Sequence, residues 1–168
     1  MIILCDTREQ RILSFPADPA LTSVREETLP YGDYMVEYSD GTRPPVAWER
    51  KGLSDLYGTL TQGYDRFKAE ILGAKEAGLT LILLIEGSLT QVQRGLPHRS
   101  TSGDQILQQL FTLQIRYRLP VIFCQSSSEA ALWLLEYAKA IGRVYAAGRK
   151  AKGEVEEVFG KTDWVEAD

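Results

Sequence analysis

The sequence predicts an α/β fold in which a mixed central sheet is flanked by helices. Three observations carry this prediction. The first third of the chain contains four short strand-like segments separated by turn residues. The remainder alternates helical patterns with continuous apolar runs. The chain has 168 residues, of which 44% are hydrophobic, and this is enough for one domain with a substantial core.

The four early strands differ in how clearly the sequence marks them. Residues 2–5 are a short apolar run that ends at a polar turn, and residues 23–29 alternate in part. Residues 34–38 and 46–51 are separated by residues 39–45, a segment rich in glycine and proline that is typical of a hairpin loop. We expect the last three of these strands to form an antiparallel meander.

Helical periodicity begins in the second third of the chain. Apolar residues recur at helical spacing over residues 64–77, and Gly78 ends this predicted helix. Residues 80–85 and 121–124 are continuous apolar runs, which are typical of strands buried on both faces. The order of four strands followed by helix, strand, helix, strand and helix predicts helices on both sides of the sheet.

Two further helices are marked by N-terminal capping residues. Thr101 and Asp104 resemble a capping box, and Ser126 with Glu129 caps a last helix that runs to about residue 141. The first of these two helices is expected to bury one face, formed by Ile106, Leu110, Leu113 and Tyr117.

The rarest residues exclude several kinds of chemistry. The chain has one histidine, His98, and two cysteines, Cys5 and Cys124, which cannot close a four-ligand zinc site unless a carboxylate joins them. A single possible cysteine pair argues against a disulfide framework, so we expect buried free thiols in an intracellular protein. We expect His98 to be a loop residue. Carboxylates and lysines therefore remain as the catalytic candidates.

The charge balance and the hydropathy pattern limit the partners. The formal net charge of −4 at pH 7 argues against a protein that coats polyanions, which would carry a basic excess. It does not exclude a nucleic-acid enzyme, because a metal-binding carboxylate cluster itself adds negative charge. No apolar run approaches the ~18 residues of a membrane span, and no signal peptide is evident. We expect a cytoplasmic or nucleoid protein with no membrane partner.

The clearest catalytic signal lies in the strand-like segment 46–51. Glu49 and Lys51 share one face of this strand because side chains alternate. In phosphodiester hydrolysis, a carboxylate at this position can hold Mg²⁺ while the ammonium positions the attacking water. Asp33 could supply a second metal ligand from the adjacent strand, and Asp6 could add a third acid. Since convergent carboxylates repel one another, such a cluster predicts a metal ion.

These residues also form a recognisable motif. Gly32-Asp33, followed after a strand and a loop by Glu49-Arg50-Lys51-x-x-x-Asp55, resembles the GD…ERKxxxD motif of the XPF/Hef/Mus-type structure-specific endonucleases. The ERKxxxD pattern alone would arise by chance in about one chain in a thousand of this length.

Other segments agree with the same family. Residues 6–9 fit its DxRE opening, and Arg66-Phe67 fits a downstream arginine-phenylalanine pair, although Glu70 stands where a glutamine is often found. The resemblance covers residues 1–146. It implies a restriction-endonuclease-like fold and an endonuclease that uses Mg²⁺ or Mn²⁺ on branched or flap DNA. The implied setting is DNA repair, recombination or replication-fork processing.

The resemblance also implies roles for individual residues. Asp33 and Glu49 would ligate the metal, together with the backbone carbonyl of Arg50. Lys51 would act on the attacking water, leaving 5′-phosphate and 3′-hydroxyl ends. The remaining expected site residues are Asp6 and Arg8, which would line the site, Asp55, which would assist Lys51 or a second metal, and Arg66, which with Arg8 would contact DNA.

Two other interpretations remain open. One is a non-catalytic DNA-binding or scaffold subunit of a nuclease heterodimer, although such partners typically lose motif acids that this chain keeps. The other is an endonuclease with little structure preference, because the helix-hairpin-helix domain that usually follows the nuclease is not present in this sequence.

The end of the chain raises the question of oligomeric state. We expect residues 1–147 to form the nuclease domain and residues 148–168 to form a partly mobile tail, first basic and then acidic. Residues 130–138 are apolar nearly all round. If one face packs on the sheet, the surplus apolar side chains, either Trp133 with Tyr137 or Leu132 with Leu135, need to be covered by something else. Family nuclease domains dimerise through their last helices, so the resemblance implies a homodimer or heterodimer. The alternative is a buried helix in a monomer.

Overall fold

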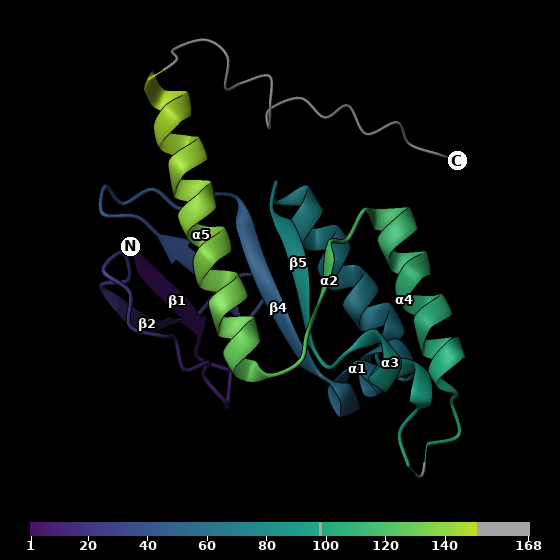
Figure 1. Ribbon diagram of the computed structural model, residues 1–168. Helices are drawn as coiled ribbons and strands as arrows, with labels where there is room; N and C mark the ends of the chain where they lie inside the picture. The colour runs from purple at the N-terminus through teal and green to yellow at the C-terminus, as the bar shows by residue number, and fades with distance from the viewer. Residues whose placement is uncertain (98, 151–168) are drawn as a thin grey trace.

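A single mixed sheet of six strands forms the centre of the molecule, with strand order β2-β1-β3-β4-β5-β6. The computed structural model describes residues 1–97 and 99–150, with side chains up to residue 145. Helices cover both faces of the sheet: in Figure 1, α5 crosses in front of it and α2 lies behind it. The predicted fold class is therefore confirmed. His98 and residues 151–168, which include most of the expected tail, lie outside the described residues.

The elements have the following bounds. The strands are β1 (Ile2–Asp6), β2 (Ser23–Glu27), β3 (Tyr34–Glu37), β4 (Val46–Gly52), β5 (Thr80–Glu86) and β6 (Val121–Cys124). The helices are α1 (Leu53–Leu60), α2 (Tyr64–Glu76), α3 (Leu89–Arg94), α4 (Gly103–Tyr117) and α5 (Ser127–Lys150). In the described part of the chain, no helix is long and apolar enough to cross a membrane.

The predicted meander is wrong for its first strand. β3 and β4 form the expected antiparallel hairpin, but β2 pairs in parallel with β1 at the outer edge of the sheet, and β1 separates β2 from β3. β2 is exposed along most of its length, so it has no apolar face from which its partner could be inferred. The long connection over residues 7–22 makes the parallel pairing possible, since parallel strands require a crossover.

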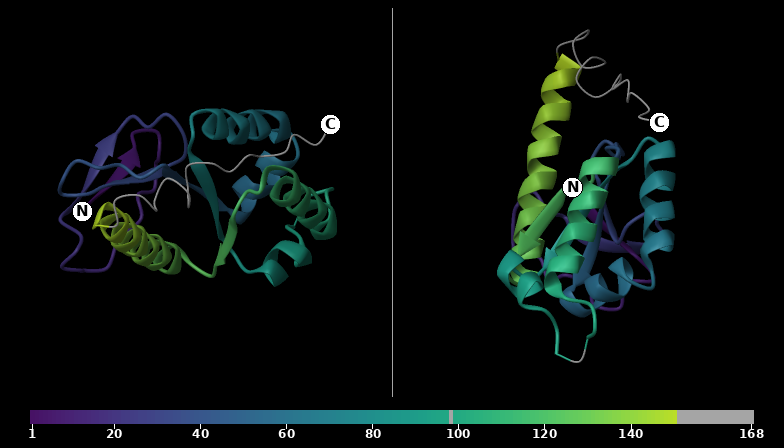
Figure 2. Two further views of the ribbon diagram at one scale, coloured as in Figure 1. Left: turned by 90° about the horizontal axis from the view of Figure 1, so that it is seen from above. Right: turned by 90° about the vertical axis from the view of Figure 1, so that its right-hand side faces the viewer.

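Two hydrophobic cores lie on opposite faces of the sheet. One contains Leu83 and Ile85 together with residues of α1, α2, α3 and α4. The other contains Ile82 and Leu84 together with the buried face of α5. Seen from above, the sheet runs between α5 on one side and α2 on the other (Figure 2). β5 is thus buried on both faces, as its continuous apolar run predicts, whereas β6 is only partly buried because it is an edge strand.

Three helices of the described structure, α2, α4 and α5, were predicted from the sequence, with small differences at their ends. α2 lies within one residue of its predicted range. The capping box of α4 is formed by Ser102 and Gln105, one residue later than the predicted pair, because the Gln105 side chain accepts from the Ser102 amide. α5 is capped by Ser126, as expected, but continues to Lys150. α1 and α3 were not predicted, because helices of 8 and 6 residues are too short to show a clear period.

The two cysteines behave as predicted. Cys5 and Cys124 are free and buried. Burial raises the pKa of each thiol to about 11, so both remain protonated at neutral pH and neither is a nucleophile there. Catalysis must therefore be sought among other groups.

Candidate active site

Acidic and basic side chains from three neighbouring strands meet at one end of the sheet, where β1 and β4 end and β3 begins. Asp6 is the last residue of β1, Asp33 immediately precedes β3, and Glu49 lies toward the end of β4. β3 runs antiparallel to both of its neighbours, so its start coincides with their ends. The topology therefore brings together acids that are far apart in the sequence.

The same acids also share one face of the sheet. Leu4, Met35 and Ala47, each two positions along the strand from Asp6, Asp33 and Glu49, belong to the core covered by α1 to α4. Side chains two residues apart on a strand point the same way. The three acids and Lys51 therefore lie on this face, beyond the end of its apolar core.

A glycine turn sets the position of Asp33. Gly32 has a φ of +70°, and a Cβ at this position would lie 2.9 Å from the carbonyl oxygen of Trp48. This close approach lets the amide of Asp33 donate to that carbonyl at 2.7 Å. The Asp33 carboxylate (Oδ2) then accepts from the amide of Arg50 at 2.7 Å. The Gly-Asp pair of the motif thus has a structural cause: only glycine allows Asp33 to lie this close to β4.

Glu49 and Lys51 form an ion pair beside Asp33. Lys51 donates through Nζ to Oε1 of Glu49, whose carboxyl group is buried. Burial, helped by the charge of Glu49, raises the pKa of Asp33 to about 7. Burial also raises the pKa of Glu49, against the opposing effect of Lys51. Burial acts to lower the pKa of Lys51, but Glu49 and Asp33 outweigh it and hold that pKa above its ordinary value.

The donor set fits a hard divalent cation. Asp33 and Glu49 offer carboxylate oxygens, and Arg50, whose carbonyl is the third expected ligand, lies beside Asp33 through its amide. Mg²⁺ is typically bound by one or two carboxylates, with water and substrate phosphate completing its coordination. Among the described residues, no group of three or more acidic, histidine or cysteine side chains is arranged to hold a metal ion. The site therefore offers a carboxylate pair and leaves room for other ligands.

Asp6 is fully engaged by hydrogen bonds. Its Oδ1 accepts from the amide and Nε of Arg8 at 2.8 and 2.6 Å, and its Oδ2 accepts from the amide of Leu29 and Nη2 of Arg8 at 2.7 and 3.0 Å. Burial acts to raise the pKa of Asp6, but these donors hold it below its ordinary value. In this geometry Asp6 holds the end of β1 against the segment after β2, while the Arg8 side chain stays 70% exposed.

The Arg50 side chain points to the opposite face and binds two acids that sequence reasoning did not select. Its guanidinium contacts Glu9 at 3.0 Å and Glu86 at 2.9 Å, and it also donates to the carbonyl of Arg11 at 2.8 Å. Glu9 closes the DxRE segment, and Glu86 is paired with Gly52 in the register of β4 and β5. That register is the signal that could have identified Glu86.

A hollow of about 520 Å³ opens at this end of the sheet. Asp33, Lys51, Arg8 and the exposed Asp55, in the first turn of α1, all line it. Arg66, on α2, is exposed and is not among the lining residues. The structure thus brings all the predicted site residues to this region except Arg66.

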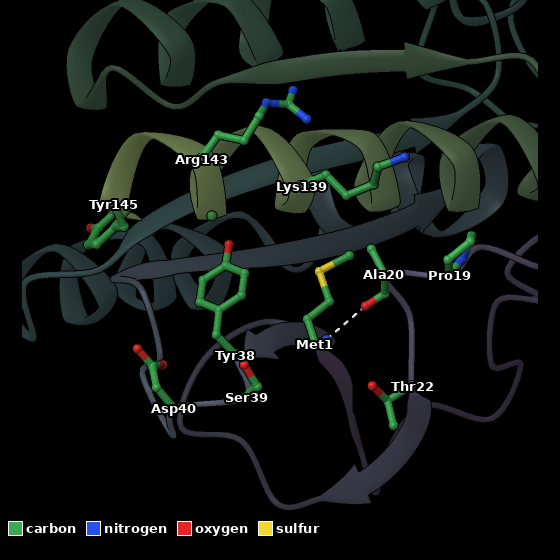
Figure 3. A pocket seen from close by; sticks show the side chains of 11 residues that line it. Met1, Pro19, Ala20, Thr22, Tyr38, Ser39, Asp40, Lys139, Arg143 and Tyr145 are labelled. Atoms are coloured by element: carbon green, nitrogen blue, oxygen red, sulfur yellow. Dashed lines mark hydrogen bonds between the residues drawn. The ribbon is translucent and has the colours of Figure 1, made fainter. Parts of the chain in front are cut away.

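A larger hollow of about 810 Å³ lies at the other end of the strands, beside α5 (Figure 3). Tyr38 stands in it with its hydroxyl donating to the carbonyl of Ala138 at 2.6 Å. Lys139, on its rim, is already paired with Asp18 and Glu136. Asp40 is the one carboxylate among the described residues that line this hollow, so the hollow lacks a carboxylate pair such as Asp33 and Glu49 at the opposite end of the strands.

Comparison with known proteins identifies a family and two similar structures. A model of the ERCC4 domain family matches residues 5–137, a range that contains every predicted site residue. The structure of XPF from Aeropyrum pernix is similar at a TM-score of 0.63, with 21% identity over 95% of this chain and 74% of that one. XPF from Aeropyrum pernix in complex with DNA gives a TM-score of 0.62, with 22% identity over 84% and 65%. Comparison with curated proteins finds no match.

Proposed function

Because this chain belongs to the ERCC4 domain family, we propose that it is a Mg²⁺-dependent endonuclease that hydrolyses phosphodiester bonds in branched or flap DNA. The XPF/Hef/Mus-type nuclease resemblance is the same family assignment, reached from sequence motifs. The observation that carries the proposal is the pair formed by half-buried Asp33 and buried Glu49 beside Lys51, at the end of the sheet where β4 ends. Its setting would be intracellular DNA repair, recombination or replication-fork processing.

Asp33 and Glu49 would hold the metal ion, with the carbonyl of Arg50, and Mn²⁺ would substitute for Mg²⁺. When bound, the ion supplies Lewis-acid chemistry by offsetting negative charge at the scissile phosphate. Its binding would also relieve the repulsion between the two carboxylates, which burial makes costly in the free protein. The raised pKa of Asp33 supports this role, because a carboxyl group held near neutrality is readily ionised by a cation.

Lys51 would position the attacking water and stabilise the charge that builds up on the phosphate. Its pKa is held above its ordinary value, so it carries a proton at neutral pH. A charged lysine donates hydrogen bonds and does not accept a proton, which favours electrostatic stabilisation over general-base catalysis for this group. Asp55, which lines the same hollow, would assist Lys51 or a second metal.

DNA would approach over the exposed side chain of Arg8, with Arg66 contributing from α2. The complex of the Aeropyrum pernix protein with DNA supports DNA as the partner. Neutralising phosphates with arginine would make binding weaken as salt increases.

The C-terminal helices support the proposal of a homodimer or heterodimer. On α5, Trp133 stacks on Tyr137 at a centroid distance of 4.7 Å, and Val144 lies further along the same side of the helix. Tyr137 and Val144 are exposed, as is Ile115 on α4. Leu132 is also exposed, whereas Leu135 is buried. Trp133 is only partly exposed and packs against the core beneath α5, and the ring of Tyr137 also contacts the buried Trp48. α4 and α5 cover opposite faces of the sheet, so the dimer proposal rests on the exposed apolar side chains of α5, which are typical of a protein interface.

The first test is cleavage of labelled splayed-arm, 3′-flap, nicked and linear duplex DNA with Mg²⁺, by the wild type and by Asp33→Ala and Lys51→Ala. Each variant should lose about 100-fold or more of the activity, because each removes a group that acts on the reacting phosphate. Ser128→Ala, at the exposed start of α5, should cut at the wild-type rate.

The outcomes separate the competing interpretations. Cleavage that requires Mg²⁺, prefers branched DNA and disappears in both variants supports the proposal. Equal cutting of linear and branched DNA would indicate an endonuclease with little structure preference. Binding of DNA with no cleavage of any substrate would contradict the catalytic proposal and favour the scaffold subunit.

A further inference from the structure

Glu70 on α2 is an acid near the proposed site to which the function above assigns no role. α2 packs on the sheet through Phe67, Ile71 and Ala74, which belong to the core on the face that carries Asp33 and Glu49. Glu70 lies between these residues in the sequence and is half-buried. It therefore lies where α2 meets the site-bearing face of the sheet, rather than on the solvent side of the helix.

A close contact fixes α2 against the segment that leads to Asp33. A Cβ at Gly73 would lie 2.9 Å from the hydroxyl oxygen of Tyr31, so the absence of a side chain lets the helix lie against this tyrosine. Tyr31 is two residues before Asp33. Glu70 is one helical turn before Gly73, on the same side of the helix and closer to the end that follows α1. This places Glu70 toward the site.

The charge of Glu70 contributes to the pKa shifts of three site residues, Glu49, Lys51 and Arg8. It adds to the effect of burial in raising the pKa of Glu49. It supports the raised pKa of Lys51, where Glu49 has the larger effect, and that of Arg8, where Asp6 has the larger effect. Glu70 itself makes no hydrogen bond or ion pair with any of the described residues.

The charges on this face leave a net negative balance. Asp6 is matched by Arg8, and Glu49 is matched by Lys51. Asp33 and Glu70 form no direct ion pair with a described cation, although both act on Lys51 and Arg8 through their charge, and Asp33 accepts from the amide of Arg50.

We infer that Glu70 is a positioning residue that strengthens divalent-cation binding at the Asp33–Glu49 pair through its charge, without being a ligand. The described residues contain no three-acid ligand group, which is why the effect is assigned to charge. The inference rests on the metal site of the proposed function. Because charge acts over several ångströms, its effect should fall as salt shortens the Debye length from about 10 Å at 0.1 M to about 3 Å at 1 M.

The test is calorimetric titration of Mn²⁺ into the full chain without DNA, at low and high KCl. Glu70→Gln keeps the shape and removes the charge, and should weaken Mn²⁺ binding about tenfold at low salt and by much less at high salt. Glu70→Asp keeps the charge and should bind nearly as the wild type does. The matched control is Glu76→Gln, an exposed acid at the end of the same helix, which should leave the affinity unchanged.

Other outcomes would overturn the inference. An affinity of Glu70→Gln within twofold of wild type would do so, as would an equal loss in Glu76→Gln or a loss that persists unchanged at high salt. If Asp33→Asn still abolished cleavage in those cases, the proposed function would stand alone. If Glu70→Gln weakened Mn²⁺ binding but no DNA were cut by any form, the inference would stand and the proposed function would fail. Circular dichroism melting checks that each variant is folded.

Discussion

At the scale of single residues, Asp33 shows how the fold changes ordinary chemistry. In water an aspartate is ionised well below neutral pH, but here burial and the nearby Glu49 raise its pKa to about 7. The folded, metal-free protein therefore binds this proton more tightly than the unfolded chain does. The stabilisation that results is complete below about pH 4 and is lost progressively as the pH rises to about 7.

The metal-free wild type should accordingly become less stable between about pH 4 and about pH 7, and Asp33→Asn should reduce that loss. The difference between the ordinary pKa of 3.8 and about 7 sets an upper limit of about 4 kcal/mol for this one group. Urea denaturation in a chelating buffer at several pH values measures the effect. A wild type whose unfolding free energy rises over this range, or an Asp33→Asn variant with the same slope as the wild type, would contradict the assignment.

At the scale of elements, the site depends on contacts that tie separate strands together. Arg50 connects β4 to the segment after β1 through Glu9 and to the end of β5 through Glu86. Asp6 connects β1 to the segment after β2. These contacts are hydrogen-bonded and mostly buried, so they hold the strand ends in place from both faces of the sheet. Gly32 holds the start of β3 against β4, because its close approach to Trp48 lets the amide of Asp33 donate to the Trp48 carbonyl.

Replacing Gly32 by alanine should therefore damage both stability and function. The new Cβ would meet the backbone carbonyl of Trp48 at 2.9 Å, at a φ of +70° that side chains disfavour. We expect a loss of about 2 to 3 kcal/mol in the free energy of unfolding, together with reduced cleavage because Asp33 moves.

Gly41 supplies the matched control for this variant. It also has a positive φ, of +79°, but nothing lies within 4 Å of its missing Cβ. Gly41→Ala should cost only about 1 kcal/mol and leave cleavage unchanged. Urea denaturation of both variants makes the comparison, and equal losses would show that the contact with Trp48 is unimportant.

At the scale of the whole molecule, the two ends of the sheet differ in character. One end gathers the carboxylates, lysine and arginine of the proposed active site. The other end has the larger hollow beside α5, whose rim lysine is already neutralised by two acids. On α5, Tyr137 and Val144 form an exposed stripe, and this stripe is where the proposed second subunit would bind.

A dimer through this stripe should be disrupted by Val144→Lys, because the side chain is 50% exposed in the single chain and would be buried in the dimer. We expect the dissociation constant of the dimer to rise roughly tenfold with no change in the melting temperature extrapolated to low concentration. Sedimentation equilibrium measures this, with Ser128→Lys at the exposed start of α5 as the control. A wild type that stays monomeric at high micromolar concentration would contradict the dimer proposal.

Local sequence was enough for the parts of the fold that depend on local patterns. The period of α2, the continuous apolar run of β5 and the turn between β3 and β4 are local signals, and all three agree with the structure. The motif residues from Asp33 to Asp55 could be selected as site candidates for a similar reason. Their types and spacing on one strand and its neighbours already limit the chemistry, and the family match covers them.

Features that depend on which segments become neighbours required the three-dimensional fold. The parallel pairing of β2 with β1, the capture of Arg50 by Glu9 and Glu86, and the approach of Glu70 to the site all join residues far apart in the sequence. Nothing in a local pattern encodes such contacts, because they follow from strand order and helix packing. The amino-acid sequence therefore specifies which groups can do the chemistry, whereas strand order and helix packing set which charges surround them.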